Sequence, residues 1–311
     1  MDVHQFLKAI NVTKRTAALT AAAAVFTMTA LTAPAAATDV EFKRGYADSR
    51  YGQTHYYVAQ PEDGKVDHTP LVFFHQTATS GQEFKPLVLN MAKDRLVFAM
   101  DTPGYGMSDR PENPPSMSEL ALSMADALEN LGYGADGAGP VDVFGFHTGV
   151  FIAAELSLHR PDLVRKVVMS GVGYFTPEGR EERFNKLPRD KKISETGEDV
   201  MKVWDYSVNR RDKRVSFERA YEQFLAMVPS AGKGWYAYHG VWSYPIEERF
   251  ALLNQENILI LQADEYLLEH SRRAKRELLK DTDMIEMMDV TGAIFDTGSD
   301  EFAKNMRAWL D

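Results

Sequence analysis

Short apolar runs alternate with longer amphipathic stretches along most of the chain. Runs of this length and continuous hydrophobicity are typical of strands buried on both faces of a sheet. We expect eight strands, over residues 41–48, 54–60, 71–74, 95–100, 141–144, 166–169, 258–261 and 284–290. The intervening stretches have helical patterning, and we expect helices over residues 82–93, 116–131, 150–159, 268–279 and 300–310. This alternation predicts an α/β fold with a mostly parallel sheet and helices on both faces.

One long segment breaks the alternation. Residues 176–255 contain charged, helical and aromatic stretches but no clear core strand. We interpret 176–255 as a helical cap inserted after the sixth strand, with residues 38–175 and 256–311 forming the core. The aromatic residues near the end of this segment either fill the interior of the cap or line an apolar pocket. On the second interpretation, His239 and Trp242 are candidate substrate-binding residues.

The N-terminal segment has the composition of an export signal. Three basic residues precede an apolar stretch rich in Ala and Thr over residues 17–31, and residues 35–37 are alanines that suit a signal peptidase. We predict a Sec-type signal peptide over residues 1–37, cleaved after Ala37, and a periplasmic or secreted protein. The alternative is an uncleaved membrane anchor over residues 17–37, although Ala and Thr contribute weakly to membrane insertion.

The charge and the cysteine content exclude several classes of binding partner and chemistry. Removing the leader's three basic residues and one acid leaves 32 Lys and Arg against 44 Asp and Glu, a formal charge of −12. An acidic chain without basic runs argues against nucleic acid and anionic membranes as partners. The absence of cysteine excludes disulfides, thiolate chemistry and thiolate metal sites. We expect a small-molecule substrate or ligand, no cofactor and no stable membrane insertion after cleavage; the oligomeric state stays open.

The most informative short sequence is Gly145-Phe146-His147-Thr148-Gly149. It lies between an expected strand and an expected helix, with a glycine two places to either side of His147. Glycines at these positions suit a tight strand-to-helix turn whose central residue is strained and crowds the neighbouring backbone. Such a turn presents the central side chain, here an imidazole, to a pocket.

Several motifs together resemble the α/β-hydrolase superfamily, in the cap-bearing branch with epoxide hydrolases, haloalkane dehalogenases and C–C bond hydrolases. Residues 71–76 resemble the third strand and its His-Gly oxyanion motif, residues 101–109 match the Asp-x-x-Gly-x-Gly-x-Ser turn, and residues 159–164 match the link to the sixth strand. The elbow places the chain in a non-standard subset with Gly-x-His-Thr-Gly, because His147 stands where the nucleophilic serine belongs. The resemblance covers nearly all of the chain beyond the leader and implies an α/β-hydrolase fold with an inserted cap.

The other triad positions also depart from the family pattern. The acid position after the seventh strand falls on Tyr266, a candidate substrate contact, while the carboxylates of Asp264 and Glu265 lie one or two places early. These two are either partners of the site or ordinary solvated charges. The base position, within residues 291–296, contains no histidine, and His270 is the last histidine of the chain. The usual triad is therefore absent.

Backbone oxyanion donors do not depend on side-chain identity. The resemblance assigns them to Thr148 and to the Gln76–Thr77 segment, where the Gln76 side chain either bonds a substrate carbonyl or braces the loop. His147 can then act as a general base or attack an acyl group directly, with Asp264, Glu265 or Asp101 as its partner. A metal role is disfavoured because no second histidine stands at ligand spacing.

Two function classes follow from this site. The first is a hydrolase, or a cofactor-independent lyase, that acts on a small apolar ester, lactone or carbonyl compound. The second is a catalytically inactive, hydrolase-like protein that binds a small molecule.

Overall fold

A single eight-stranded sheet organises the part of the chain that the computed structural model describes, residues 40–188 and 193–311. Its strand order is β1-β2-β4-β3-β5-β6-β7-β8. The strands are β1 (Lys43–Ser49), β2 (Gly52–Ala59), β3 (Leu71–Phe74), β4 (Val97–Met100), β5 (Val141–Phe146), β6 (Val164–Ser170), β7 (Ile258–Asp264) and β8 (Asp283–Thr291). β2 pairs antiparallel with both neighbours and every other pair is parallel, which confirms the predicted fold class. The predicted signal peptide and its cleavage site lie outside the described residues.

The middle strands are buried along their whole length. Every residue of β3, β4 and β5 is buried, because helices cover both faces of the sheet at this point. The parallel strands end at one edge of the sheet, so the loops after β3, β5, β6, β7 and β8 all emerge there. This common edge brings the expected elbow and oxyanion segments together.

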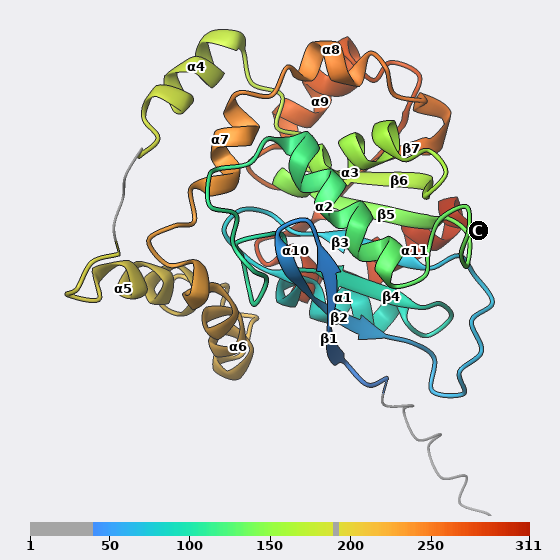
Figure 1. Cartoon of the computed structure of the whole chain (residues 1–311), viewed down its shortest axis with the longest axis horizontal. Helices are drawn as coiled ribbons and strands as arrows, with labels where there is room; N and C mark the ends of the chain where they lie inside the picture. The colour runs from blue at the N-terminus through green and yellow to red at the C-terminus, as the bar shows by residue number, and fades with distance from the viewer. Residues whose placement is uncertain (1–39, 189–192) are drawn as a thin grey trace, which may run out of the picture. The chain divides into compact units, whose positions relative to one another are not determined.

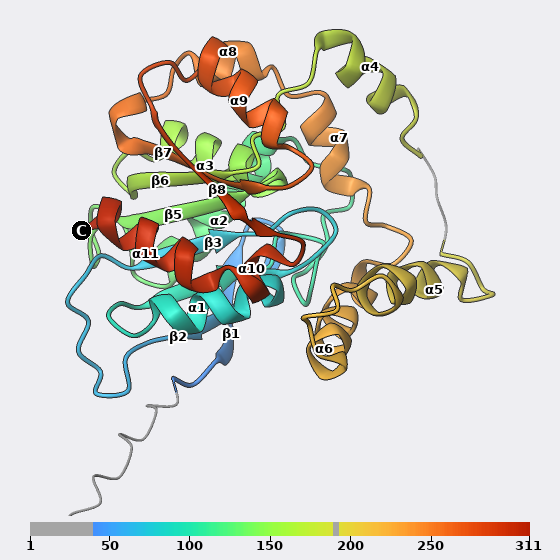
Figure 2. The same cartoon turned by 180° about the vertical axis from the view of Figure 1, so that it is seen from behind.

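Two apolar clusters form the core, one on each face of the sheet. α2 (Met117–Asn130) and α3 (Thr148–His159) lie on one face, in front of the sheet in Figure 1. α1 (Lys85–Met91), α10 (Ile294–Thr297) and α11 (Ser299–Leu310) lie on the other face, seen from the front in Figure 2. α9 (Leu268–Glu277) contributes Ala274 to the α2–α3 cluster.

The described residues between β6 and β7 form helices and no strand. They comprise α4 (Pro177–Asn185), α5 (Glu198–Trp204), the π-helical turn η3 (Asp205–Asn209), α6 (Phe217–Met227), α7 (Tyr236–Trp242) and α8 (Ile246–Phe250). α7 and α8 supply side chains to the α2–α3 cluster, whereas η3 and α6 have a small cluster of their own. Within the described ranges, no helix has the length and apolar character needed to cross a membrane.

The expected helix over residues 82–93 differs most from the structure. Residues Gly81–Phe84 form a 3-10 turn, η2, and the α-helix begins only at Lys85. Ser80 caps this turn by accepting a hydrogen bond from the Gln82 N–H. Pro86, in the first turn of α1, has no N–H to donate and is compatible with a helix start at this point.

Candidate active site

His147 occupies a strained turn between β5 and α3. Its φ of 48° and ψ of −106° make it the one non-glycine residue with positive φ in the described part of the chain. The flanking glycines are required by close packing. A Cβ on Gly145 would lie 2.3 Å from the Gly149 carbonyl oxygen, and a Cβ on Gly149 would lie 1.9 Å from the Phe74 carbonyl oxygen. This geometry is that of a nucleophile elbow with an imidazole at its apex.

The imidazole of His147 is hydrogen-bonded to a carboxylate. Its Nε2 lies 3.1 Å from Oε2 of Glu265, and the two side chains are 22% and 11% exposed. The ring rests 3.9 Å from the Phe146 ring, centroid to centroid. Gly171 provides the space for it, because a Cβ there would meet the His147 ring at 2.2 Å. The carboxylate one place before the expected acid position and the elbow residue thus form a dyad.

Glu265 is itself held by its neighbours. Its Oε2 accepts a hydrogen bond of 2.9 Å from the Leu267 N–H, and its Oε1 accepts one of 2.8 Å from the Gln262 side chain. Gln262 in turn accepts from the Gly171 N–H at 3.1 Å. Burial raises the pKa of the Glu265 carboxyl, but the hydrogen bonds and charge interaction with His147 and the contacts with Leu267 and Gln262 outweigh it and hold the pKa below its usual value. Glu265 is therefore an ionised acceptor near neutral pH.

The other candidate carboxylates lie elsewhere. Asp264 is the exposed last residue of β7 and makes no hydrogen bond to His147. Asp101 is buried, where its oxygens accept from the N–H groups of Gly81 and Met107 and contact His55 at 2.7 Å. Of the three carboxylates proposed as partners from the sequence, the structure brings Glu265 to His147.

One of the two expected oxyanion donors is engaged within the protein. The Thr77 N–H donates to Oγ1 of Thr148 at 3.3 Å, and both residues are buried. Thr148 is the first residue of α3, so its own N–H is one of the donors that a helix leaves without an internal partner. The hydroxyl of Thr148 thus fills a position in which a substrate oxygen would meet the Thr77 N–H.

Gln76 braces the loop through Glu83. Its backbone N–H and its side-chain amide donate to the two Glu83 carboxylate oxygens at 3.0 and 2.9 Å. The neighbouring His75 is buried, which lowers its pKa. Since the Thr102 N–H donates to Nε2 of His75, its Nδ1 carries the proton that bonds the Gln76 carbonyl. These contacts fix the loop after β3.

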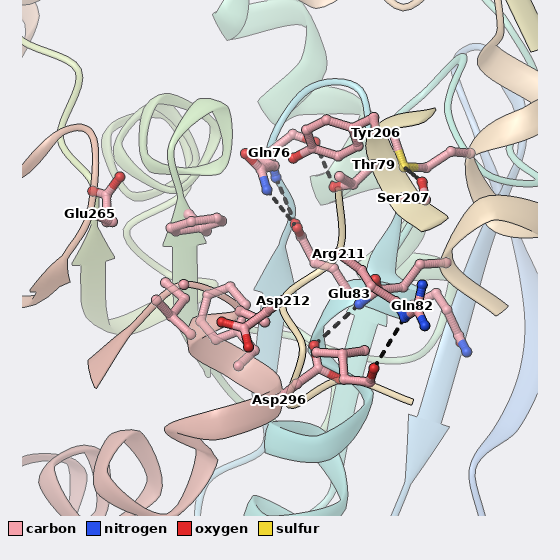
Figure 3. Close-up of a pocket in the computed structure, with 18 of the residues that line it drawn as sticks. Gln76, Thr79, Gln82, Glu83, Tyr206, Ser207, Arg211, Asp212, Glu265 and Asp296 are labelled. Carbon is pink, nitrogen blue, oxygen red and sulfur yellow. Dashed lines mark hydrogen bonds between the residues drawn. The ribbon is translucent and has the colours of Figure 1, made fainter. Parts of the chain in front are cut away.

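A cavity of about 570 Å³ opens beside this dyad. His147, Glu265 and the largely exposed Tyr266 line it together with Gln76 and Glu83, and Figure 3 shows Glu265 apart from Gln76 and Glu83. Further lining comes from η3, the loop over residues 210–215, α6 and residues 292–296. Residues 292–296 follow β8, where a hydrolase triad would carry its histidine, and here they supply lining but no base.

The cavity carries charged groups within a lining that is largely apolar. Its lining includes four carboxylates and two guanidinium groups, those of Glu83, Asp212, Glu265, Asp296, Arg210 and Arg211. Burial raises the pKa of Glu83 to about 7, even though hydrogen bonds from Gln76 lower it. The sequence analysis missed Glu83, because no motif marks it. Its spacing of seven residues from Gln76 becomes meaningful only once η2 folds the loop back.

The structure places His239 and Trp242 away from this cavity. Both belong to α7, where the His239 ring packs 5.0 Å from Phe184 and Trp242 stacks on Tyr238 at 5.9 Å. The His239 ring thus packs on α4 and the Trp242 ring on its own helix, as in the first of the two interpretations of the aromatic segment. No group of three or more potential metal-ligating side chains occurs among the described residues.

Comparison with known proteins gives consistent results. The family model for the alpha/beta hydrolase fold matches residues 69–238, more than half of the chain. The 2-(acetamidomethylene)succinate hydrolase of Mesorhizobium japonicum is 28% identical over 45% of this chain and 48% of its own length. The chain therefore matches about half or less of the length of such curated relatives.

Solved structures resemble the chain over most of its length. An esterase from Thermogutta terrifontis has a TM-score of 0.64 at 15% identity, covering 86% of this chain and 98% of that chain. Naproxen esterase from Bacillus subtilis has a TM-score of 0.64 at 17% identity, covering 87% and 92%. At sequence identities this low, the structural similarity establishes a shared fold and nothing more.

Proposed function

The chain belongs to the α/β-hydrolase fold family, and we propose that it is a hydrolase whose general base is His147, oriented by Glu265. One observation carries the proposal: the imidazole at the elbow is hydrogen-bonded to the carboxylate that follows β7 and lines the cavity. In a serine hydrolase these roles are divided among three residues, and here the base has moved to the elbow itself.

Glu265 determines which nitrogen of His147 is free. Because the carboxylate accepts a hydrogen bond, Nε2 carries the proton and Nδ1 keeps its lone pair. None of the described residues forms a hydrogen bond with Nδ1. The negative charge of Glu265 also stabilises the imidazolium that forms when Nδ1 takes a proton.

The proposed reaction is hydrolysis by an activated water. The water gives a proton to Nδ1 of His147 while its oxygen bonds to the carbonyl carbon of an ester or lactone, whose π electrons move to the carbonyl oxygen. Collapse of this intermediate breaks the bond to the alcohol oxygen, which takes the proton back from the imidazolium. Nδ1 adjoins the ring carbon that bears the side-chain stem, so direct attack by it on an acyl carbon is more hindered than proton transfer.

The intermediate needs an oxyanion contact. The N–H of Thr148, in the first turn of α3, supplies one donor. The Thr77 N–H supplies a second when the Thr148 hydroxyl rotates away from it. A hydroxyl bond of 3.3 Å is long for a hydrogen bond, so its exchange for an oxyanion is favourable.

The cavity volume suits a small substrate. About 570 Å³ falls within the range of roughly 300–1,000 Å³ of typical small-molecule sites. The relatives named as succinate-derivative hydrolases and the esterases among the structural neighbours support hydrolysis of a small carbonyl compound.

The test is a panel of para-nitrophenyl esters and lactones with the purified protein and His147→Ala. Loss of the base is expected to lower kcat/KM by about 10²–10⁴. His239→Ala is the matched control, because it removes an imidazole that packs on Phe184 and does not line the cavity. Equal rates in wild type and His147→Ala would contradict the proposal.

Small-molecule binding without turnover is the second candidate function. The hydrogen bond from the Thr77 N–H to Thr148 favours this function, because in the observed pairing this N–H is not available to the oxyanion of a transition state. A compound that raises the melting temperature without being consumed, together with no hydrolysis across the panel, would support this function.

A further inference from the structure

We propose that the substrate carries a carboxylate remote from the bond that is broken, and that Arg211 binds it. The reaction in this proposal rests on the proposed hydrolase function, whereas the anion contact is measurable on its own. Arg211 stands on the cavity wall and, in Figure 3, well to one side of Glu265. The proposal therefore concerns one end of an extended small molecule whose other end reaches His147.

The carboxylates that line the cavity have donors within the protein. Asp212 accepts from the Arg214 guanidinium at 2.6 and 2.9 Å, and Asp296 accepts from Arg219 at 2.7 Å. Glu265 and Glu83 accept from His147 and Gln76 at the distances given above. None of these acids is paired with Arg211, so they are not its counterions.

The two arginines that line the cavity differ in whether a carboxylate is paired with them. Arg210 forms an ion pair of 2.9 Å with Asp205. Arg211 has no carboxylate within ion-pair distance among the described residues. Its Nη1 and Nε donate instead to the backbone carbonyls of Val208 at 2.8 Å and Val215 at 3.3 Å. Arg211 is thus a charge on the cavity wall that lacks a counterion.

The two carbonyl contacts also hold the guanidinium in place. Val208 and Val215 are buried, 4% and 7% exposed, and both belong to the apolar cluster beneath η3. None of the described residues accepts from Nη2 of Arg211. A guanidinium held through Nε and Nη1 loses little side-chain entropy on binding, and its Nη2 keeps both N–H groups for a carboxylate.

The experiment compares two esters of equal size. One is para-nitrophenyl hemiglutarate, which has a free carboxylate, and the other is the analogue with an isopropyl group in its place. Arg211→Met is expected to lower kcat/KM for the hemiglutarate by about tenfold to a hundredfold, mainly through KM, while the isopropyl ester changes by less than about twofold. Arg211→Lys keeps the charge but loses the guanidinium that the two carbonyls hold, and is expected to fall between wild type and Arg211→Met.

Lys213→Met is the matched control. Lys213 is an exposed cation of the same loop that does not line the cavity. Its removal is expected to leave the ratio of the two esters unchanged. An equal effect of Lys213→Met and Arg211→Met would mean that only the overall field of the loop matters, and would overturn the proposal.

The remaining outcomes separate this proposal from the proposed function. An equal loss for both esters in Arg211→Met would assign Arg211 a structural role in holding residues 208–215 and overturn the anion site. If wild type hydrolyses neither ester, the hydrolase proposal fails on these substrates, and calorimetric titration with glutarate and with its neutral diamide decides the anion site. Binding of glutarate but not of the diamide, lost in Arg211→Met, supports the anion site. Equal binding of both compounds, or binding of neither, refutes it.

Discussion

Glu265→Gln isolates the charge of the dyad with almost no change in side-chain volume. Three donors meet the carboxylate: Nε2 of His147 at 3.1 Å, the Leu267 N–H at 2.9 Å and the Gln262 amide at 2.8 Å. A glutamine has one oxygen to offer. If that oxygen faces His147 and Leu267, its NH₂ group faces the Gln262 amide, donor against donor. The imidazole keeps a neutral acceptor but loses the anion behind it.

This geometry predicts the size of two effects of Glu265→Gln, one on kcat and one on the free energy of unfolding. A hydrogen bond to a charged group contributes about 1.5–3 kcal/mol, so loss of the charge is expected to lower kcat for ester hydrolysis by about tenfold to 150-fold. The opposed donors leave a buried polar group unsatisfied, which costs about 1–3 kcal/mol of unfolding free energy. At roughly 2–4 °C per kcal/mol, the melting temperature falls by about 2–12 °C.

The dependence on pH separates the charge from simple misfolding. The pKa of Glu265 is lowered from its usual 4.5, so its ionised form stabilises the fold. That contribution is present above pH 4.5 and is lost as the pH falls through the folded-state pKa. The stability gap between wild type and Glu265→Gln, measured by thermal and urea unfolding, is therefore expected to close in acid. A gap that is independent of pH would refute the argument.

Asp264→Asn is the control for this experiment. It removes a carboxylate one residue away that is exposed and makes no hydrogen bond to His147. Its kcat and unfolding free energy are expected to stay within about twofold and 0.5 kcal/mol of wild type. An equal loss of activity in Asp264→Asn would refute the assignment of Glu265 as the partner.

Three further substitutions test other parts of the site. Gly171→Ala places a methyl group 2.2 Å from the His147 ring, at a residue whose φ is +71°. It is expected to lower the rate of ester hydrolysis at least tenfold, measured by kinetics, and to destabilise the fold by about 1 kcal/mol or more, measured by thermal melting. Glu83→Gln removes a carboxyl whose pKa is raised by burial to about 7. The free energy of unfolding of wild type is therefore expected to fall by about 3 kcal/mol relative to the variant as the pH rises from 4.5 to 7. A difference in urea unfolding that stays constant with pH would contradict this. His147→Ser restores a serine without a base and is expected to hydrolyse esters no faster than His147→Ala, whereas fast hydrolysis would reveal a base elsewhere.

The sheet could be predicted from the sequence because burial is encoded locally. The four apolar residues of β3 and of β4 lie in the interior on both faces, so a continuous hydrophobic run is sufficient to identify each strand. The elbow was equally readable, since Gly145 and Gly149 are required by backbone approach on either side of His147. The approach at Gly145 lies within the elbow itself, whereas Gly149 meets Phe74 of β3, so its role was readable from the motif alone.

The choice between Asp264 and Glu265 could not be predicted. It depends on where β7 stops pairing with β8, and the register shifts between Ala263 and Asp264. That irregularity leaves Asp264 exposed and leaves the next carboxylate to meet His147. A one-residue offset of this kind arises from pairing across the sheet and not from the local sequence.

The charged groups that line the cavity could not be predicted either. The aromatic run near Trp242 suggested that this segment lines the pocket, but the Trp242 ring packs on Phe175 and on Tyr238 of its own helix. The lining comes instead from η3 and the loop that contains Arg211, whose local sequence resembles any solvated charged segment. Only the position of that loop beside the ends of β3 and β8 makes its charges part of the site.

In the proposed site, Glu265 holds the proton of His147 on Nε2 and leaves Nδ1 open. Heteronuclear NMR of protein labelled with the heavy nitrogen isotope at histidine measures this directly, with His147→Ala identifying the resonance. At mildly alkaline pH we expect a protonated Nε2 and a bare Nδ1 in wild type, and a mixture of tautomers in Glu265→Gln. A wild-type His147 with its proton on Nδ1 would contradict it.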